Sequence, residues 1–182
     1  AKASATNERG RGFAASKSLD HKTKTYWATE DDVIQASLTV NFDQPTTFNR
    51  FLVQEFIALG QRVKAFSLEA QTIDGWTEIA SETTIGYKRI LRFSDITASA
   101  VRLNIKDAKA CPTISNIEIY HAPKLLVPPT FSRNQSGEVS LSTPENNVAI
   151  YFTLDGSTPT AESQKYEAPF NQAGPAKIQA IT

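Results

Sequence analysis

Apolar and polar residues alternate along most of the chain, so that every second residue is apolar within short runs. Neighbouring side chains of a strand point to opposite faces of a sheet, and this period of two therefore predicts half-buried β-strands. The clearest runs lie at residues 38–42, 51–53, 66–70, 91–93, 101–105 and 117–119. They recur about every 8–12 residues with turn signals between them, which is typical of a β-sandwich or β-barrel. Single helical turns are expected only near Leu19 and at 57–59.

Prolines interrupt the pattern once, between Ala122-Pro123 and Pro128-Pro129. Consecutive prolines cannot donate to a sheet and favour extended linkers. New alternations follow at 139–141, 148–154 and 178–180. We therefore expect an all-β chain of two domains, one spanning residues 1–124 and a smaller one spanning residues 125–182.

The two ends of the chain suggest a piece of a longer protein. The first residue is Ala1 rather than Met, and no apolar secretion segment follows it. The last residues, 178–182, lie inside an alternating run. We expect a truncated second domain and a parent chain that extends further.

Composition excludes several classes of protein. With 182 residues, the chain is short for a barrel of eight strands and eight helices, which needs about 250. Lys and Arg number 19, and so do Asp and Glu, so a net charge of zero gives no reason to expect a nucleic-acid partner. The sequence contains no run of 18 apolar residues, so it predicts no membrane-spanning helix. The single cysteine, Cys111, excludes an internal disulfide framework and a four-cysteine zinc site, and we expect an inert thiol.

Several strings in the first domain occur in the order and spacing of a known family. They are Ser18-Leu19-Asp20, Thr25-Tyr26-Trp27-Ala28, residues 62–70, Asp74-Gly75-Trp76, residues 100–105 and Ile117-Glu118-Ile119-Tyr120. Over about 120 residues the domain resembles the discoidin family, also called coagulation-factor type C or carbohydrate-binding module family 32. The resemblance implies a jelly-roll sandwich in which Trp27 and Trp76 both pack the core.

Two narrower resemblances follow. Residues 54–63 and 84–91 are similar to the discoidin-type domain of family 29 α-L-fucosidases. Ile150–Thr160, with Ser163, Tyr166, Pro169 and Phe170 after it, resembles the C-terminal domain of chitobiases and β-hexosaminidases. This implies a small immunoglobulin-like β-sandwich with Tyr151, Tyr166 and Phe170 in its core. In its Asp155-Gly156 turn, we expect Asp155 to accept backbone donors, Gly156 to adopt a positive φ and Pro159 to fix the exit.

No residues in the sequence form a catalytic pattern. Glycoside hydrolysis needs two carboxylates on either side of one bond, and nothing pairs any two here. His21 and His121, the only histidines, lack a nucleophile pattern, and Gly10 and Gly12 precede no strand-to-helix signal. We expect a fragment that is not an enzyme and requires no cofactor, within a parent that is a glycoside hydrolase.

The discoidin resemblance implies a structural calcium ion, with oxygen ligands at Asp20, Thr25 and Glu118. Two residues depart from the family pattern, because His21 replaces a glycine and Lys22 replaces a frequent Asp or Asn. In the alternative interpretation, Asp20 caps a turn and Glu118 is an ordinary strand residue. The acidic run at 30–32 is a second possible cation site, although a solvated loop is the favoured interpretation.

The residues expected to contact a partner lie in loops of the fucosidase-like strings. They are Glu55, Phe56, Gln61, Arg62, Tyr87, Lys88 and Arg89. Exposed rings stack on sugars, and arginine offers a planar fork of donors to hydroxyls or carboxylates. The same anchors would suit docking against the catalytic domain of the parent chain, and the two interpretations stay open.

The sequence thus predicts a non-catalytic accessory region of a secreted glycoside hydrolase, an α-L-fucosidase or else a chitobiase or hexosaminidase. Its partners would be a glycan, the parent's catalytic domain, or both, in an extracellular or periplasmic location. The alternative is a stand-alone adhesion or lectin module without an attached enzyme.

Overall fold

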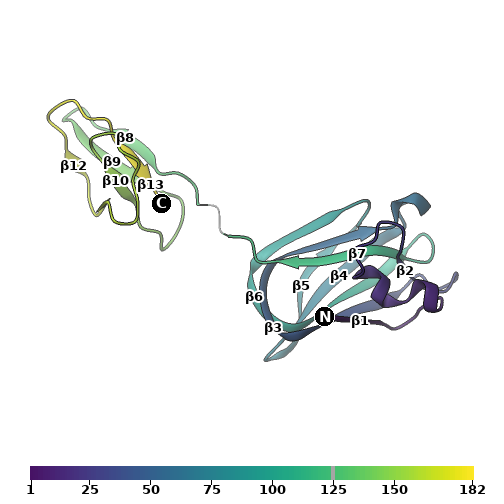
Figure 1. Ribbon diagram of the computed structural model, residues 1–182. Coiled ribbons are helices and arrows are strands. Elements are labelled where there is room, and N and C mark those ends of the chain that lie inside the picture. The colour runs from purple at the N-terminus through teal and green to yellow at the C-terminus, as the bar shows by residue number, and fades with distance from the viewer. Residues whose placement is uncertain (124–125) are drawn as a thin grey trace. The chain divides into compact units, whose positions relative to one another are not determined.

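The computed structural model describes residues 1–123 and 126–182, and these form two compact units, Ala1–Ala122 and Pro123–Thr182 (Figure 1). The domain boundary that we predicted between residues 124 and 125 lies outside the described residues. The expected all-β fold is confirmed, because strands dominate and the helical segments are short 3-10 turns. No described helix has the length and apolar character needed to cross a membrane.

The first unit contains a single hydrogen-bonded sheet in the order β2-β7-β3-β6-β4-β5, with β1 paired to β3. Every pairing in it is antiparallel. Its strands are β1 (Lys2–Ala5), β2 (Trp27–Ala28), β3 (Ala36–Glu55), β4 (Val63–Thr72), β5 (Gly75–Glu82), β6 (Arg89–Ala108) and β7 (Thr113–Tyr120). Its 3-10 turns are η1 (Arg11–Phe13), η2 (Ala15–Ser18) and η3 (Ile57–Leu59), the last at the predicted place.

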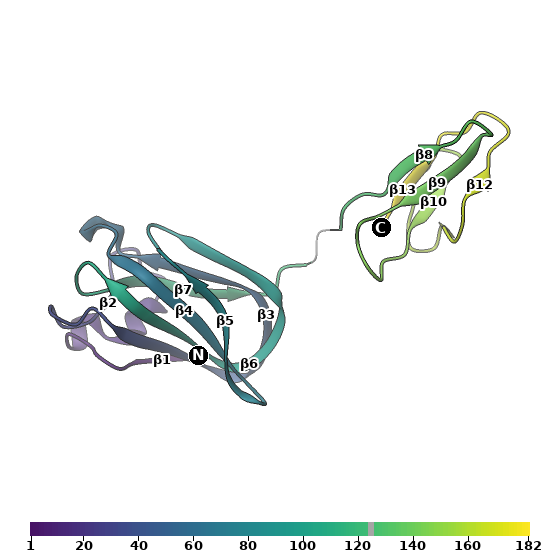
Figure 2. The same ribbon diagram turned by 180° about the vertical axis from the view of Figure 1, so that it is seen from behind.

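Strands β3 and β6 bend, and this folds the sheet into a sandwich (Figure 2). Each is 20 residues long. The first half of β3 pairs with β1 and with the second half of β6, as in Leu38↔Leu103. The second half of β3 pairs with β7 and with the first half of β6, as in Phe51↔Leu91. A shift of register between Asn41 and Thr46 marks the bend.

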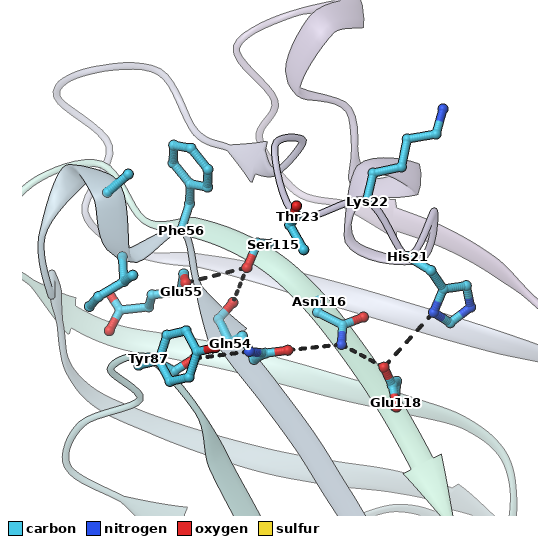
Figure 3. A pocket seen from close by; sticks show the side chains of 12 residues that line it. His21, Lys22, Thr23, Gln54, Glu55, Phe56, Tyr87, Ser115, Asn116 and Glu118 are labelled. Carbon is cyan, nitrogen blue, oxygen red and sulfur yellow. Dashed lines mark hydrogen bonds and ion pairs between the residues drawn. The ribbon is translucent and has the colours of Figure 1, made fainter.

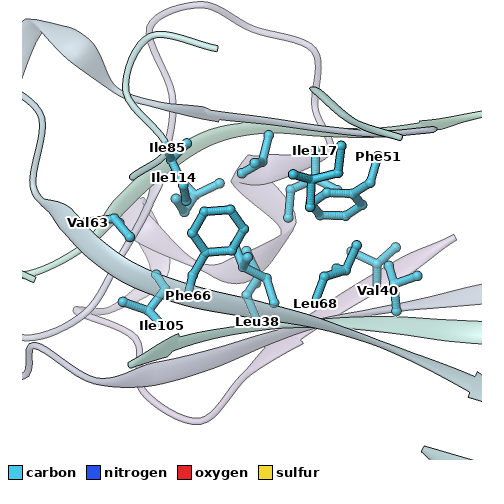
Figure 4. Packing of buried hydrophobic residues seen from close by; sticks show 14 of the residues in the cluster. Leu38, Val40, Phe51, Val63, Phe66, Leu68, Ile85, Ile105, Ile114 and Ile117 are labelled. Atoms are coloured by element: carbon cyan, nitrogen blue, oxygen red, sulfur yellow. The ribbon is translucent and has the colours of Figure 1, made fainter. Parts of the chain in front are cut away.

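The predicted alternations supply the core between the two layers (Figure 4). Phe51 and Ile117 come from the β3–β7 layer, whereas Leu38, Phe66 and Leu68 come from the opposite layer, and all are buried. Trp27 on β2 is fully buried, as the family resemblance implied, and its indole N–H donates to the carbonyl of Asn7 at 3.0 Å.

The prediction of a core position for Trp76 is wrong. Its side chain is 37% exposed, because the β4–β5 hairpin sets Trp76 opposite Gln71, on the outward face of the sheet. The guanidinium of Arg102 lies 4.1 Å from the centre of the indole ring, an attractive cation–π distance. Glu69 holds that guanidinium in turn, at 2.7 Å from its Nε. Trp76 therefore covers a surface ion pair.

The second unit consists of two three-stranded antiparallel sheets. One contains β8 (Thr130–Arg133), β9 (Glu138–Ser142) and β12 (Phe170–Asn171). The other contains β10 (Tyr151–Thr153), β11 (Gln164–Lys165) and β13 (Gln179–Ile181). Val139, Leu141, Ile150 and Phe152 form the buried core, and Tyr166 and Phe170 pack against it, half-buried.

In the Asp155-Gly156 turn of the second unit, Asp155 and Gly156 have the roles that the sequence predicts. Oδ1 of Asp155 accepts hydrogen bonds from the backbone N–H and the hydroxyl of Ser157, at 2.9 and 2.6 Å. Gly156 has a φ of 82°, in the region that favours glycine.

Candidate functional site

A pocket of about 390 Å³ opens in the first unit, where the end of β3, η3 and β7 meet the loop at 21–23 (Figure 3). Its walls come from four segments that are far apart in the sequence. The lining residues are His21, Lys22, Thr23, residues 54–58, Tyr87, Ser115, Asn116 and Glu118.

A continuous row of polar side chains crosses this pocket. Gln54 Nε2 donates to the carbonyl of Tyr87 at 3.2 Å, and Gln54 Oε1 accepts from Asn116 Nδ2 at 3.0 Å. Asn116 Nδ2 also donates to Glu118 Oε1 at 2.6 Å, and His21 Nδ1 lies 3.9 Å from that same oxygen. The row follows from strand periodicity, because Asn116 and Glu118 point outward between the core residues of β7.

Apolar side chains stand beside the polar row. Tyr87 is 66% exposed and Ile57 is 42% exposed. The ring of Phe56 stacks on that of Tyr26, with centroids 4.3 Å apart and planes inclined by 17°. Aromatic faces next to a few fixed amide and carboxylate groups are the usual composition of a pocket for a neutral polar ligand such as a sugar.

Glu55 has a different position from the one that the sequence suggested, because it is buried and presents no carboxylate to a partner. It is 2% exposed. One carboxylate oxygen accepts the backbone N–H groups of Arg62 and Val63 at 2.7 and 2.9 Å, and the other accepts that of Gly86 at 2.7 Å. Glu55 thus fixes the two loops from which the pocket is built.

The remaining predicted contact residues do not line the pocket. The guanidinium of Arg62 turns inward, and its Nη1 donates to the carbonyl and Sγ of Cys111, both at 2.8 Å. Arg89 pairs with Glu82, while Gln61 and Lys88 are exposed outside the pocket.

Of the seven predicted contact residues, the structure therefore brings together Phe56, Tyr87 and, behind them, Glu55. Sequence reasoning did not select Gln54 and Asn116 as contacts. The outward phase of their strands was the signal that could have found them.

The predicted calcium loop is held by its own hydrogen bonds. Asp20 Oδ1 accepts from the Thr25 hydroxyl at 2.7 Å and from the Lys22 backbone N–H at 3.0 Å. The Thr25 hydrogen bond is the main reason that the pKa of Asp20 lies below its ordinary value. Glu118 lies on β7 with Asn116 and His21 as neighbours. Asp20 thus makes the turn that the alternative interpretation described, but only one of its two oxygens takes part.

Two oxygens in this region fit a hard cation. Asp20 Oδ2 and Asn116 Oδ1 are buried and have no hydrogen-bond partner. Carboxylate and amide oxygens are ligands that calcium accepts, together with hydroxyl and backbone carbonyl oxygens. Within the described part of the chain, no three His, Cys, Asp or Glu side chains gather in a way that could hold a metal. An ion here would need neutral oxygens to complete its shell.

The acidic run at residues 30–32 does not converge on one point. Glu30 interacts with Asn7 through its backbone N–H and its side chain, whereas Asp31 pairs with Arg9. All three residues of the run are exposed. These contacts agree with the solvated loop that the sequence favoured.

Each of the two units matches a known domain family. The model of the F5/8 type C domain matches residues 1–119, and that of the chitobiase/β-hexosaminidase C-terminal domain matches residues 128–182.

Several known proteins share the first unit. α-L-Fucosidase 1 of Arabidopsis thaliana is 32% identical over 111 residues, which are 59% of this chain and 22% of that protein. A crystal structure from Bacteroides thetaiotaomicron, provisionally named an α-L-fucosidase, is 33% identical with a TM-score of 0.63, over 66% of this chain and 27% of that one. The chain spans about a fifth of the length of the curated relatives it matches.

A smaller protein shares the fold alone. Chitosan-binding module 2 of a Paenibacillus sp. IK-5 chitosanase/glucanase, in complex with chitotriose, aligns with a TM-score of 0.59 at 18% identity. The alignment covers 65% of this chain and 95% of that module. The first unit therefore has the same fold as that module.

Proposed function

The chain belongs to the F5/8 type C domain family, and from this premise we propose that it is a non-catalytic accessory region of a glycoside hydrolase. Its first unit binds a glycan weakly in the pocket beside Phe56 and Tyr87. Its second unit serves as a spacer or a further small sandwich.

The observation that carries this proposal is the pocket itself. Exposed apolar groups, Tyr87 and Ile57, stand next to a row of amide and carboxylate side chains whose orientations are fixed by mutual hydrogen bonds. Sugars present the matching chemistry, with apolar C–H faces and a ring of hydroxyls that both donate and accept. The fold is one on which the Paenibacillus module holds chitotriose, which supports the proposal at the level of architecture only.

The parent enzyme that we propose is an α-L-fucosidase. Relatives of this name match the first unit at 32–33% identity, over about a fifth to a quarter of their own length. Catalysis would then reside in the remainder of the parent chain. The match of residues 128–182 leaves a chitobiase or hexosaminidase parent as the second possibility. An extracellular or periplasmic location is part of the same proposal, since polymeric glycans are found there.

A second candidate function is docking of the first unit against the parent's catalytic domain. Ile57 and Leu59 on η3 are 42% and 45% exposed, and Ile57 lines the pocket together with Tyr87. Exposed apolar side chains that gather in one place indicate a contact surface more strongly than scattered ones. In this function the same apolar groups would be covered by protein rather than by sugar.

The experiment that tests glycan binding is calorimetric titration of the purified chain with fucose, galactose, N-acetylglucosamine and fucosylated oligosaccharides. We expect saturable binding with a millimolar dissociation constant, on the order of −4 kcal/mol. Tyr87→Ala should weaken it at least tenfold. Tyr120→Ala is the matched control, because Tyr120 is an exposed tyrosine of the same unit that does not line this pocket.

Each outcome separates the alternatives. Equal losses in both tyrosine variants would place binding elsewhere than in the pocket. Absence of binding across the panel would overturn glycan recognition and leave docking as the function. Tight, multivalent attachment to a surface glycan by a parent that lacks a hydrolase domain would instead establish a stand-alone adhesion or lectin module.

A further inference from the structure

Two arginines lie directly opposite each other on neighbouring strands of the first unit. The register of β3 and β6 pairs Arg50 with Arg92. Both side chains point outward, because the residues that follow Arg50 and precede Arg92, Phe51 and Leu91, are buried in the core. Opposite side chains on antiparallel strands have Cβ atoms about 4.5–5.5 Å apart, and like charges in this arrangement repel each other. The pair therefore favours a negative charge placed between the two guanidinium groups.

Neither guanidinium forms an ion pair within the residues that the structure describes. The side chain of Arg92 is exposed and has no hydrogen-bond partner in this part of the chain. Arg50 is half-buried, and its Nη1 donates to the carbonyl of Asn49 at 2.7 Å. That carbonyl is neutral, so it leaves the charge of Arg50 without a counterion.

The acidic groups closest to this pair are engaged elsewhere. Asp95 accepts from Asn49 Nδ2 at 2.8 Å with one oxygen, and His121 Nε2 lies 3.1 Å from the other. Hydrogen bonds from His121 and Asn49 lower the pKa of Asp95 below its ordinary value, with a smaller contribution from the charge of Arg50. Glu118 lies diagonally from Arg50 on β7, but its Oε1 belongs to the polar row of the pocket. Two adjacent positive charges thus remain for a partner outside the chain.

An aliphatic surface lies beside the arginine pair. The next outward pair in the same register is Leu52 with Ile90. Ile90 is 49% exposed, whereas Leu52 is covered by its neighbours. Aliphatic groups next to fixed donors suit a ring that has a C–H face and carries an anionic substituent. A free inorganic anion would leave this aliphatic surface without a contact.

We propose that Arg50 and Arg92, with Ile90 beside them, bind a sulfated polysaccharide on the outward face of β3 and β6. The two oxygens of a carboxylate are satisfied by the fork of a single guanidinium. A sulfate half-ester presents three terminal oxygens around one centre, as a phosphate ester does, and can accept from both forks at once. The sulfate group would therefore relieve the repulsion between the two arginines.

This site is separate from the pocket, because none of Arg50, Arg92 and Ile90 lines the pocket. The proposal therefore goes beyond the proposed function and does not rest on it. The contacts are few and exposed, so a single sulfated sugar should bind weakly. Affinity should increase with the number of sulfate groups along a polymer, since neighbouring groups rebind before the chain diffuses away.

The test is calorimetric titration of the whole chain with dextran sulfate, carboxymethyl dextran and unmodified dextran, which share one backbone. We expect saturable binding of dextran sulfate, binding of carboxymethyl dextran that is at least about threefold weaker, and no binding of dextran. Arg50→Gln and Arg92→Gln should each weaken dextran sulfate binding at least about threefold, and the double variant about tenfold, because exposed ion pairs have modest energies.

Arg11→Gln is the matched control for the loss of one positive charge. Arg11 is exposed on η1, outside the two strands, and it too has no ion pair in the described part of the chain. Its replacement should change the affinity for dextran sulfate by less than about 1.5-fold. Arg92→Lys keeps the charge but lacks the planar fork, so it should still weaken binding about twofold.

Equal losses in Arg11→Gln and Arg92→Gln would indicate a general attraction between the chain and polyanions, and would overturn the proposal. Absence of dextran sulfate binding, or equal affinity for carboxymethyl dextran, would overturn it as well. Urea unfolding separates these results from misfolding. Because Arg92→Gln removes a repulsion between strands, its midpoint should equal or exceed that of the unaltered chain. A clearly lower midpoint would assign the arginine pair to the stability of the fold and contradict a ligand site.

The outcomes are distinct from those of the glycan experiment. The sugars of that titration carry no sulfate, and the dextran polymers carry no fucose, galactose or N-acetylglucosamine. Failure of either proposal therefore leaves the other intact.

Discussion

Glu55 takes up both backbone groups of Gly86. Its backbone N–H donates to the Gly86 carbonyl at 3.0 Å, and its carboxylate accepts the Gly86 N–H at 2.7 Å. Gly86 has a φ of 68°, in the left-handed region, and the next residue is Tyr87 of the pocket. The position of Tyr87 therefore depends on the buried carboxylate of Glu55, which holds the residue before Tyr87 in the chain.

Glu55→Gln should destabilise the first unit. The amide has one acceptor oxygen in place of two, so at least one of the three backbone N–H groups would face an N–H donor instead. Leaving a buried donor unsatisfied costs about 1–3 kcal/mol. Urea unfolding, followed by the fluorescence of the buried Trp27, would measure the change in the free energy of unfolding.

Glu78→Gln is the matched control for this prediction. Glu78 also lies in the first unit, but it is half exposed and pairs with Lys106 at 3.3 Å. Exposed ion pairs contribute about 0–1 kcal/mol, so Glu78→Gln should change the free energy of unfolding only slightly. If Glu55→Gln and Glu78→Gln lowered the free energy of unfolding equally, the three backbone hydrogen bonds of Glu55 would contribute no more than an exposed ion pair.

Replacement of the buried Trp27 should lower stability much more than replacement of the exposed Trp76. Trp27→Ala removes a fully buried ring and should cost about 3–5 kcal/mol of stability. Trp76→Ala removes an exposed ring whose cation–π contact with Arg102 is worth about 0.5–1 kcal/mol. Unfolding midpoints in urea give the comparison, and a Trp76→Ala loss as large as that of Trp27→Ala would contradict the outward position.

Strand periodicity predicted the core because each strand shows it directly in the sequence, as in Leu38 or Phe66. The core position expected for Trp76 came from the family resemblance. The face that Trp76 takes is decided by the hairpin register, and this register depends on pairing with β4. The pocket was found only in part for a related reason. Loop aromatics such as Tyr87 stand out in a sequence, whereas Asn116 acquires its role only when β7 lies beside the loop at 20–25.

The sequence also did not predict that the side chain of Arg62 points inward. Gly60 and Gln61 before it suggest an exposed loop, but its guanidinium contacts the carbonyl and Sγ of Cys111, 49 residues away. Contacts of that range depend on the closure of the whole sandwich. Local patterns therefore predict strands and turns, while the direction of long side chains in loops follows from the tertiary fold.

Acid should weaken the second unit through Asp155. Hydrogen bonds from the hydroxyl and then the backbone N–H of Ser157 lower the pKa of Asp155 below its ordinary value. A carboxyl whose pKa is lowered by folding stabilises the folded state above its unfolded pKa of about 3.9, and this contribution is lost as the pH falls through the lower folded pKa. The stability contributed by Asp155 should thus be complete at pH 7 and should decline below about pH 4.

Thermal unfolding followed by NMR signals of residues 128–182, from about pH 7 to pH 2.5, measures this effect. Asp155→Asn keeps an acceptor oxygen but does not titrate. The difference in Tm between the two proteins should therefore shrink as the pH falls. A difference that stays constant over this range would show that the carboxylate charge does not contribute.

Gly156→Ala should destabilise the second unit, because the turn requires a backbone conformation and a close contact that a Cβ does not fit. Gly156 has a φ of 82°, where a residue with a Cβ is strained by roughly 1–2 kcal/mol. An added Cβ would also lie 2.6 Å from Cδ of Lys177, whose backbone N–H is held by the carbonyl of Leu154 at 3.2 Å. The Lys177 side chain would have to move while its backbone stays fixed.

Gly174→Ala is the matched control in the same unit, because nothing lies within 4 Å of its added Cβ and its φ is not positive. Urea unfolding, followed by the same NMR signals, should give a loss of about 1–2 kcal/mol for Gly156→Ala and less than about 0.5 kcal/mol for Gly174→Ala. Similar midpoints for the two variants would mean that the Asp155-Gly156 turn tolerates a side chain, and that the close approach of Lys177 does not restrict it.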